Sequence, residues 1–183
     1  MREHKVFFTA DTHFSHKNII RYCDRPFDSS EEMNATMISN WNAVVRKHDT
    51  VYHMGDFCFG NPEPIIQQLH GHIILVRGNH DKQITGEMEK LFLAIYDRKF
   101  IKIQGQYTVL DHWAGRVWDK SHHNSYQLYG HSHGRLPPVG KQWDVGVDNN
   151  NFTPLSEKDI IRIMKSRPDN EGYINKEKRY HER

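Results

Sequence analysis

The sequence has few cysteines and no long apolar run. Its 183 residues include only Cys23 and Cys58, too few for a disulfide framework, and no CxxC pair. A reducing, cytoplasmic compartment is therefore expected. No run approaches the roughly 18 apolar residues of a membrane-spanning helix. The short apolar run near the N-terminus stops at Asp11, which is not the pattern of a secretory signal.

The sequence also lacks an excess of either charge. Lys and Arg number 25 against 23 Asp and Glu, which gives a net charge of +2. This balance weighs against a protein that coats nucleic acid by neutralising phosphates, although it permits a local basic groove. Histidine is abundant, with 14 residues. Because a single histidine is usually a surface residue, only the position of each along the chain can indicate a metal site or a catalytic role.

The length predicts one domain at residues 1–165, followed by a charged tail at 166–183 with a composition typical of disordered segments. Strands and helices alternate first, and consecutive strands follow, which indicates an α/β fold with mixed sheets. The apolar periodicity predicts strands at 5–10, 50–54, 72–76, 99–103, 106–110, 126–129 and 142–147. It predicts helices at 31–47, 62–69, 87–96 and 156–167.

Five of the apolar runs end in Asp, Asn and His side chains. The five clusters are Asp11-Thr12-His13, Gly55-Asp56, Gly78-Asn79-His80-Asp81, Asp111-His112 and Gly130-His131-Ser132-His133. In open α/β sheets, ligands bind outside the carboxyl ends of the strands, so we expect these clusters to converge on one site. The glycines before three of them allow sharp turns and a close approach of the backbone to a ligand.

The chemistry of these side chains points to metal ions. They offer oxygen and imidazole nitrogen without thiolate, which suits Mn²⁺, Fe²⁺, Zn²⁺ or Ni²⁺ and argues against a structural cysteine-ligated zinc site. Pure Ca²⁺ or Mg²⁺ sites would not need so many imidazoles. Seven candidate side chains exceed the six positions of one octahedral ion. Two divalent ions that share a bridging carboxylate accommodate them, and we expect Mn²⁺ first.

In this order, the motifs D-x-H, GD, GNHD, a single His and GHSH resemble those of the calcineurin-like metallophosphoesterase superfamily. The resemblance runs from Asp11 to His133, about two-thirds of the chain. It implies two packed mixed sheets flanked by helices, a four-layer sandwich with a dinuclear metal centre at the strand ends. With no inserted cap domain, the chain resembles the small, single-domain phosphodiesterases of this superfamily.

The resemblance also implies a role for each motif residue. One ion would be held by Asp11, His13 and His133, the other by Asn79, His112 and His131, with Asp56 as the bridge and His80 as the acid that protonates the leaving group. His122 and His123 compete with His112, which is preferred because it directly follows a strand. Five residues near the motifs are expected to contact the phosphate: His16, Arg77, His122, His123 and Arg135.

The resemblance implies a phosphoesterase that hydrolyses phosphodiester bonds of small or nucleotide-like molecules. A hydroxide bridging two ions would attack phosphorus, and His80 would protonate the departing oxygen. One alternative is a catalytically silent binding scaffold of the same fold. Another is a nuclease, in which Phe14, Trp113 or Trp118 would stack a base. A small phosphoester is the expected partner, no membrane is expected, and homo-oligomers remain compatible with the sequence.

Overall fold

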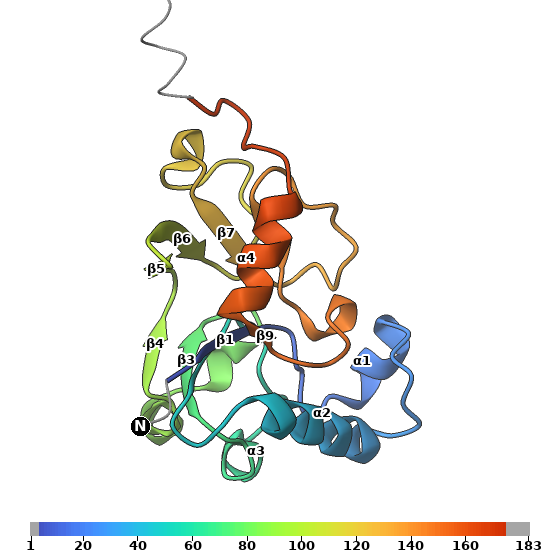
Figure 1. The fold of residues 1–183 in the computed structure, drawn as a ribbon. Helices are drawn as coiled ribbons and strands as arrows, with labels where there is room; N and C mark the ends of the chain where they lie inside the picture. The colour runs from blue at the N-terminus through green and yellow to red at the C-terminus, as the bar shows by residue number, and fades with distance from the viewer. Residues whose placement is uncertain (1–3, 175–183) are drawn as a thin grey trace, which may run out of the picture.

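The computed structural model describes residues 4–174 and shows two mixed β-sheets packed against each other, with helices around them (Figure 1). The predicted two-sheet α/β architecture is confirmed. Within residues 4–174, no helix has both the length and the apolar character needed to cross a membrane.

The first sheet has the strand order β4-β3-β2-β1-β9. Its strands are β1 (Val6–Thr9), β2 (Thr50–His53), β3 (His72–Val76), β4 (Ala94–Tyr96) and β9 (Leu155–Ser156). The first four are parallel and paired without offset, so that Thr9 lies beside His53 and His53 beside Leu75. The loops that follow them therefore emerge at one edge of the sheet.

The second sheet has the order β5-β6-β7-β8. It is formed by β5 (Lys99–Ile103), β6 (Gln106–Leu110), β7 (Tyr126–Tyr129) and β8 (Gln142–Asp144). The first two strands form the predicted antiparallel hairpin, whereas β6, β7 and β8 are mutually parallel. The carboxyl ends of β6 and β7 carry the two remaining strand-end clusters.

Alternate residues of β1 enter two different apolar cores. Phe7 packs in a core with Met33, Met37 and Trp41 of helix α2 (Ser30–Val44). Phe8 packs on the other face of the strand, in a core that both sheets share with helix α4 (Glu157–Ser166). A strand covered on both faces reads as a continuous apolar run, which is the pattern of residues 5–10.

Both long helices begin after a serine that caps them. Ser29 accepts a hydrogen bond from the Glu32 amide, and Ser156 forms a complete capping box with Asp159. Two short helices lie on either side of α2 in the chain. Helix α1 (Lys17–Tyr22) was not predicted from the sequence, and helix α3 (Glu63–Ile66) is shorter than predicted. Elements of six residues or fewer carry little periodicity, so their bounds are poorly determined by sequence.

The prediction of a helix at 87–96 is wrong. That segment forms a 3₁₀ helix, η2 (Gly86–Leu91), and then strand β4. The Leu93 amide donates to Ile73 and the Tyr96 carbonyl accepts from Arg77, so pairing with β3 replaces helical hydrogen bonds.

The strand predicted at 142–147 ends early, at Asp144. The Asp144 carboxylate accepts the Gly146 amide at 2.8 Å and turns the chain into a 3₁₀ helix, η4 (Val147–Asn149). Side-chain capping of a turn by aspartate thus ends a segment that periodicity alone extended.

The first part of the predicted charged tail packs against the domain. Asn170 is 5% exposed, and its amide nitrogen donates to the carbonyls of Ser121 and Ser125 at 2.9 Å each. These two carbonyls flank the loop before β7. The remainder of the predicted tail, residues 175–183, lies outside the described residues.

The Asn170→Ala variant should therefore unfold more easily. The change leaves two carbonyls without their donor, and the Lys141 amide loses its acceptor, Asn170 Oδ1. We expect the free energy of unfolding to fall by about 1–3 kcal/mol, measured by urea denaturation. The neighbouring exposed Glu171→Ala serves as the control and should change it little. Equal effects of the two variants would contradict an anchoring role for Asn170.

Candidate metal centre

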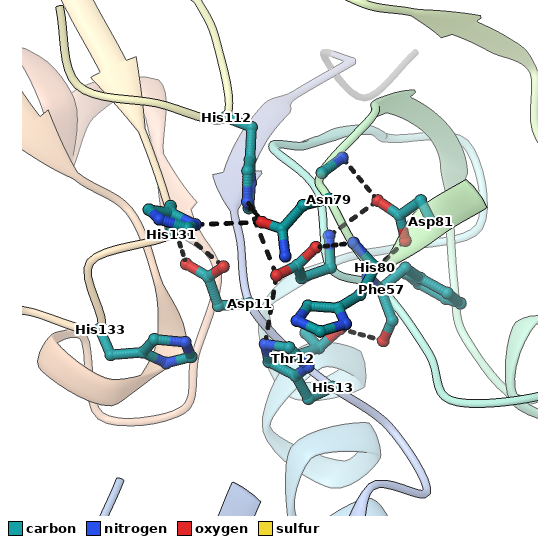
Figure 2. A network of polar contacts seen from close by, with 12 residues as sticks. Asp11, Thr12, His13, Phe57, Asn79, His80, Asp81, His112, His131 and His133 are labelled. Carbon is teal, nitrogen blue, oxygen red and sulfur yellow. Dashed lines mark hydrogen bonds and ion pairs between the residues drawn. The ribbon is translucent and has the colours of Figure 1, made fainter. Parts of the chain in front are cut away.

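The two sheets approach most closely where their strands end. Ala10 forms an isolated bridge with Gly146, which follows β8. A Cβ atom at Gly130 would lie 2.6 Å from Ala10 Cβ and 2.7 Å from Asp11 Oδ2, so only glycine fits there. As a result, the Asp11 carboxylate lies beside the loop that follows β7 and accepts the His131 amide at 2.8 Å (Figure 2).

The backbone around this junction is strained. Five of the seven predicted metal ligands have positive φ although none is glycine: Asp11 (55°), His13 (46°), Asp56 (57°), His131 (66°) and His133 (49°). Such residues cost on the order of 1–3 kcal/mol each and persist only where the surroundings hold them, typically at functional sites. The turns aim the five side chains inward from three separate loops.

The first group of donors consists of Asp11, His13 and His133, whose ligand atoms lie within 4.8 Å of one another. His13 Nε2 is buried and has no hydrogen-bond partner. Burial and the nearby His133 lower the pKa of His13 far below its usual range, so its imidazole is neutral and offers a lone pair. Two imidazoles and a carboxylate facing one space form a cation site in chemical terms.

His133 is oriented from behind by Asp148, at 2.7 Å from its Nδ1. Burial alone would lower the pKa of His133, but the Asp148 carboxylate outweighs it and raises that pKa to about 10. A carboxylate behind one ring nitrogen fixes the proton there and increases the basicity of the other nitrogen. This is the usual arrangement behind a metal-ligating histidine.

The second group consists of Asp56, His112 and His131, again with ligand atoms within 4.8 Å. Asn79 joins it, since its Oδ1 lies 3.1 Å from both His112 Nε2 and His131 Nδ1. His112 Nδ1 lies 2.7 Å from the Met54 carbonyl and must carry the ring proton to donate to it. His112 Nε2 therefore carries a lone pair that faces the Asn79 oxygen, an arrangement that a bound cation would satisfy.

Asp56, although a member of the second group, also borders the first group. Its Oδ2 is 3.5 Å from His13 Nε2 and 3.6 Å from His112 Nε2, while its Oδ1 accepts the His80 amide at 2.9 Å. Behind it, the buried Asp81 carboxylate accepts the Asp56 amide at 2.8 Å and fixes the strained turn. One carboxylate oxygen equidistant from a donor of each group suits an anion shared by two cations.

His80 and His16 lie at the border of the first group. The exposed His80 ring is centred 5.5 Å from that of His13, and within the described chain its imidazole has no hydrogen-bond partner. The His16 ring is also 5.5 Å from that of His13, and it stacks on Phe59 at 4.3 Å. Both imidazoles therefore adjoin the donors, and within residues 4–174 neither is hydrogen-bonded to another protein group.

The other predicted phosphate contacts point elsewhere. Arg77 donates to the Asp81 and Ile84 carbonyls and pairs with Glu89 at 2.5 Å, so its guanidinium supports a turn instead of the centre. Arg135 donates to the Tyr22 carbonyl, at the end of α1. Arg77 is therefore unsuited to contact phosphate, whereas contact by Arg135 stays a prediction.

The His122-His123 pair also lies away from the donors. Both residues belong to a 3₁₀ helix, η3 (Ser121–His123), which precedes β7, whereas His131 and His133 follow that strand. The pair is thus at the opposite end of β7, about 13 Å away at 3.3 Å per residue. This placement removes the competition with His112 for a metal-ligand role and gives the pair no contact with a phosphate at the centre.

Sequence reasoning missed the residues that hold the donors in place. Arg25, Asp148 and the Met54 carbonyl contact ligand residues, and Asp81 was predicted only as a member of its motif. No motif marks Arg25 or Asp148, which are 123 positions apart and meet only in the folded chain. His53 is fully buried and contacts the Thr12 hydroxyl, which lies between two of the proposed ligands.

Comparison with known proteins gives consistent matches. A sequence model of the calcineurin-like phosphoesterase superfamily domain matches residues 5–143. An uncharacterized protein of Methanocaldococcus jannaschii is 35% identical over 180 residues, which cover 90% of this chain and 93% of that protein. The gene 66 protein of Mycobacterium phage L5 is 36% identical over 82 residues, 42% of this chain and 39% of the phage protein.

A solved structure has the same fold. The crystal structure of a protein of unknown function from Aquifex aeolicus superposes with a TM-score of 0.70 at 26% identity, and the match covers 88% of this chain and all of that one. The matched domain model includes every strand-end cluster from Asp11 to His133.

The Asp56→Asn variant should bind divalent cations at both groups more weakly. The substitution keeps an oxygen for the His80 amide but removes the charge that faces both groups. We expect Mn²⁺ affinity to fall at least about tenfold at each group, because the affinity of a site for a cation depends on the charge of its ligands. Isothermal titration and metal analysis after dialysis measure this loss.

Asp49→Asn is a matched control. Asp49 is as deeply buried as Asp56. It accepts the backbone amide of Lys5, just before β1, and that of Arg46, just after α2, so it lies at the opposite end of the sheet from the donors. Its variant should bind Mn²⁺ as the wild type does. Normal Mn²⁺ binding by Asp56→Asn would show that its carboxylate is not shared by cations.

Proposed function

The chain belongs to the calcineurin-like phosphoesterase superfamily, and from that premise we propose that it hydrolyses phosphodiester bonds of small or nucleotide-like substrates with two divalent cations. The observation that carries the proposal is the position of Asp56 Oδ2, between His13 of one donor group and His112 of the other. A carboxylate in this position would be shared by two cations, as in hydrolytic dinuclear centres.

The two groups of donors would each hold one cation. The residues are Asp11, His13 and His133 for one, Asn79, His112 and His131 for the other, and Asp56 for both. Mn²⁺ is our first choice, and iron, zinc or nickel accept the same donors. When bound, such a pair of cations supplies an acidified water as nucleophile and stabilises charge on phosphoryl oxygens. The protein itself contributes only two formal negative charges, Asp11 and Asp56, so the loaded centre attracts a phosphate anion.

His80 would supply the proton that the leaving oxygen needs. Its amide is tied to Asp56 Oδ1, which fixes the backbone next to the shared carboxylate. Its exposed imidazole has no hydrogen-bond partner within the described residues, so it is available to a substrate. A ligand role is less suitable, because neither donor group includes His80.

Exposed aromatic rings on both sides of the centre favour a nucleotide-like diester. Trp113 is 46% exposed, and its ring is centred 4.8 Å from that of His112. Phe59 is 52% exposed and stacks on His16, beside the other group. Rings of this kind stack on nucleobases without strict sequence preference.

The other two aromatic residues predicted to stack bases are unsuitable. Phe14 is fully buried, and Trp118 donates its indole N–H to the Ser125 carbonyl. The orientation of Arg77 away from the centre also favours a diester, because a monoester dianion gains more than a diester from an adjacent guanidinium.

Hydrolysis should require divalent cations and should favour diesters. Removal of cations by a chelator should abolish hydrolysis of bis(p-nitrophenyl) phosphate, and added Mn²⁺ should restore it. We expect kcat/KM for this diester to exceed that for p-nitrophenyl phosphate. A monoester preference above about tenfold, or 1.4 kcal/mol in transition-state stabilisation, would overturn the diester assignment, and full activity without cations would overturn the metal mechanism.

The His80→Ala variant should separate proton transfer from binding. A general acid contributes about 10²–10⁴-fold, but only where the leaving group needs a proton. p-Nitrophenolate leaves as an anion, whereas a ribose alkoxide does not. We therefore expect a small loss of kcat on p-nitrophenyl diesters and a far larger loss on nucleoside diesters, with Mn²⁺ binding unchanged. Equal losses on both substrates would contradict the acid role, and loss of one cation would make His80 a ligand.

A further inference from the structure

A buried ion pair lies directly behind the first donor group. The Arg25 guanidinium and the Asp148 carboxylate form two parallel hydrogen bonds, Nε to Oδ1 at 2.8 Å and Nη2 to Oδ2 at 2.9 Å. The two side chains are 0% and 8% exposed. Burying both charges carries a large desolvation cost, which such a pair offsets only when further hydrogen bonds satisfy its remaining donors and acceptors.

The remaining donors of Arg25 hold the loop that carries two proposed ligands. Nη2 donates to the Asp11 carbonyl at 2.7 Å, and Nη1 donates to the Thr12 carbonyl at 2.9 Å. These carbonyls lie between Asp11 and His13, which both have positive φ. The guanidinium therefore stabilises the strained backbone that directs both side chains into one space.

The remaining acceptor capacity of Asp148 is directed at the third proposed ligand. Its Oδ2 lies 2.7 Å from His133 Nδ1 and holds a ring proton there, so Nε2 is the nitrogen left for a cation. One ion pair thus contacts two members of the first group, Asp11 and His133, and the Thr12 carbonyl that precedes the third. The second group is held by different residues, the Met54 carbonyl and the Asp81 carboxylate.

We infer that Arg25 and Asp148 are positioning residues that set the affinity of the cation site formed by Asp11, His13 and His133. This inference rests on the proposed dinuclear function, because it assumes that these three residues bind a cation. A merely structural pair would tie the loop after α1 to η4 without a selective effect on metal binding. A positioning pair changes one cation site and leaves the other intact.

Two conservative variants test the selectivity. In Arg25→Lys, an ammonium retains the charge but cannot reach the carboxylate and both carbonyls. In Asp148→Asn, an NH₂ group replaces one carboxylate oxygen and cannot accept from Arg25 or His133, and the negative charge is lost. We expect each variant to bind one Mn²⁺ ion about 10–100-fold more weakly and the other normally in isothermal titration. Asp49→Asn remains the control, with both affinities at the wild-type level.

A spectroscopic measurement distinguishes positioning from a loss of stability. In the metal-free protein, long-range ¹⁵N–¹H spectra should show a proton on His133 Nδ1, beside the Asp148 carboxylate. In Asp148→Asn, the side-chain oxygen that remains can keep the hydrogen bond from Arg25 Nε, which places the new NH₂ group beside Nδ1. We therefore expect Nδ1 to lose its proton in that variant and Nε2 to keep one. Arg25→Lys should leave the Nδ1 proton in place, because it retains the carboxylate beside the ring.

The outcomes separate the inference from the function on which it rests. Wild-type affinities at both sites in Arg25→Lys and Asp148→Asn would overturn the inference while leaving the proposed function intact. Equal weakening of both sites, accompanied by a lower melting temperature in chelator, would assign the pair a general structural role and would also overturn it. Failure of the wild-type protein itself to bind Mn²⁺ at either group would overturn the proposed function and the inference together.

Discussion

The close approach of the two sheets at Ala10, Gly130 and Gly146 is the constraint on which the centre depends. Parallel strands of one sheet bring Asp11, Asp56 and Asn79 to a common edge, but the imidazoles of His112, His131 and His133 come from the other sheet. A side chain at Gly130 would separate the two edges, since its Cβ would meet Ala10 and Asp11. Each sheet alone therefore provides only part of each donor group.

This junction brings oxygen and nitrogen donors together in a small, mostly buried space. The oxygen atoms of Asp11, Asp56 and Asn79 face imidazole nitrogens, and the buried guanidinium of Arg25 is directed at carbonyls and Asp148. Burying a polar atom that has no hydrogen-bond partner, such as His13 Nε2, costs stability. A bound cation would relieve that cost and would couple the stability of the folded state to the occupancy of the centre.

The sequence predicted which side chains would meet at the strand ends, because strand ends are marked by local chemistry. Apolar runs that stop at Gly, Asp, Asn or His give both the end of the strand and the identity of the ligand. Contacts between distant segments left no such mark. The pairing of β4 with β3 overrode the helical pattern at 87–96, the hydrogen bonds of Arg77 turned it away from the centre, and the Arg25–Asp148 pair forms only on folding.

The separation of Arg25 from Asp148 has a consequence for the order in which the proposed ligands become available during synthesis. The chain emerges from its N-terminus, so Asp11, His13, Asp56 and Asn79 are available first. His112, His131 and His133 follow, and Asp148 comes last among the residues that contact the donors. A nascent chain therefore passes through a period in which both proposed carboxylate ligands are exposed with only one of the four imidazoles. Selection of a cation by nitrogen donors would then fall to the nearly finished chain.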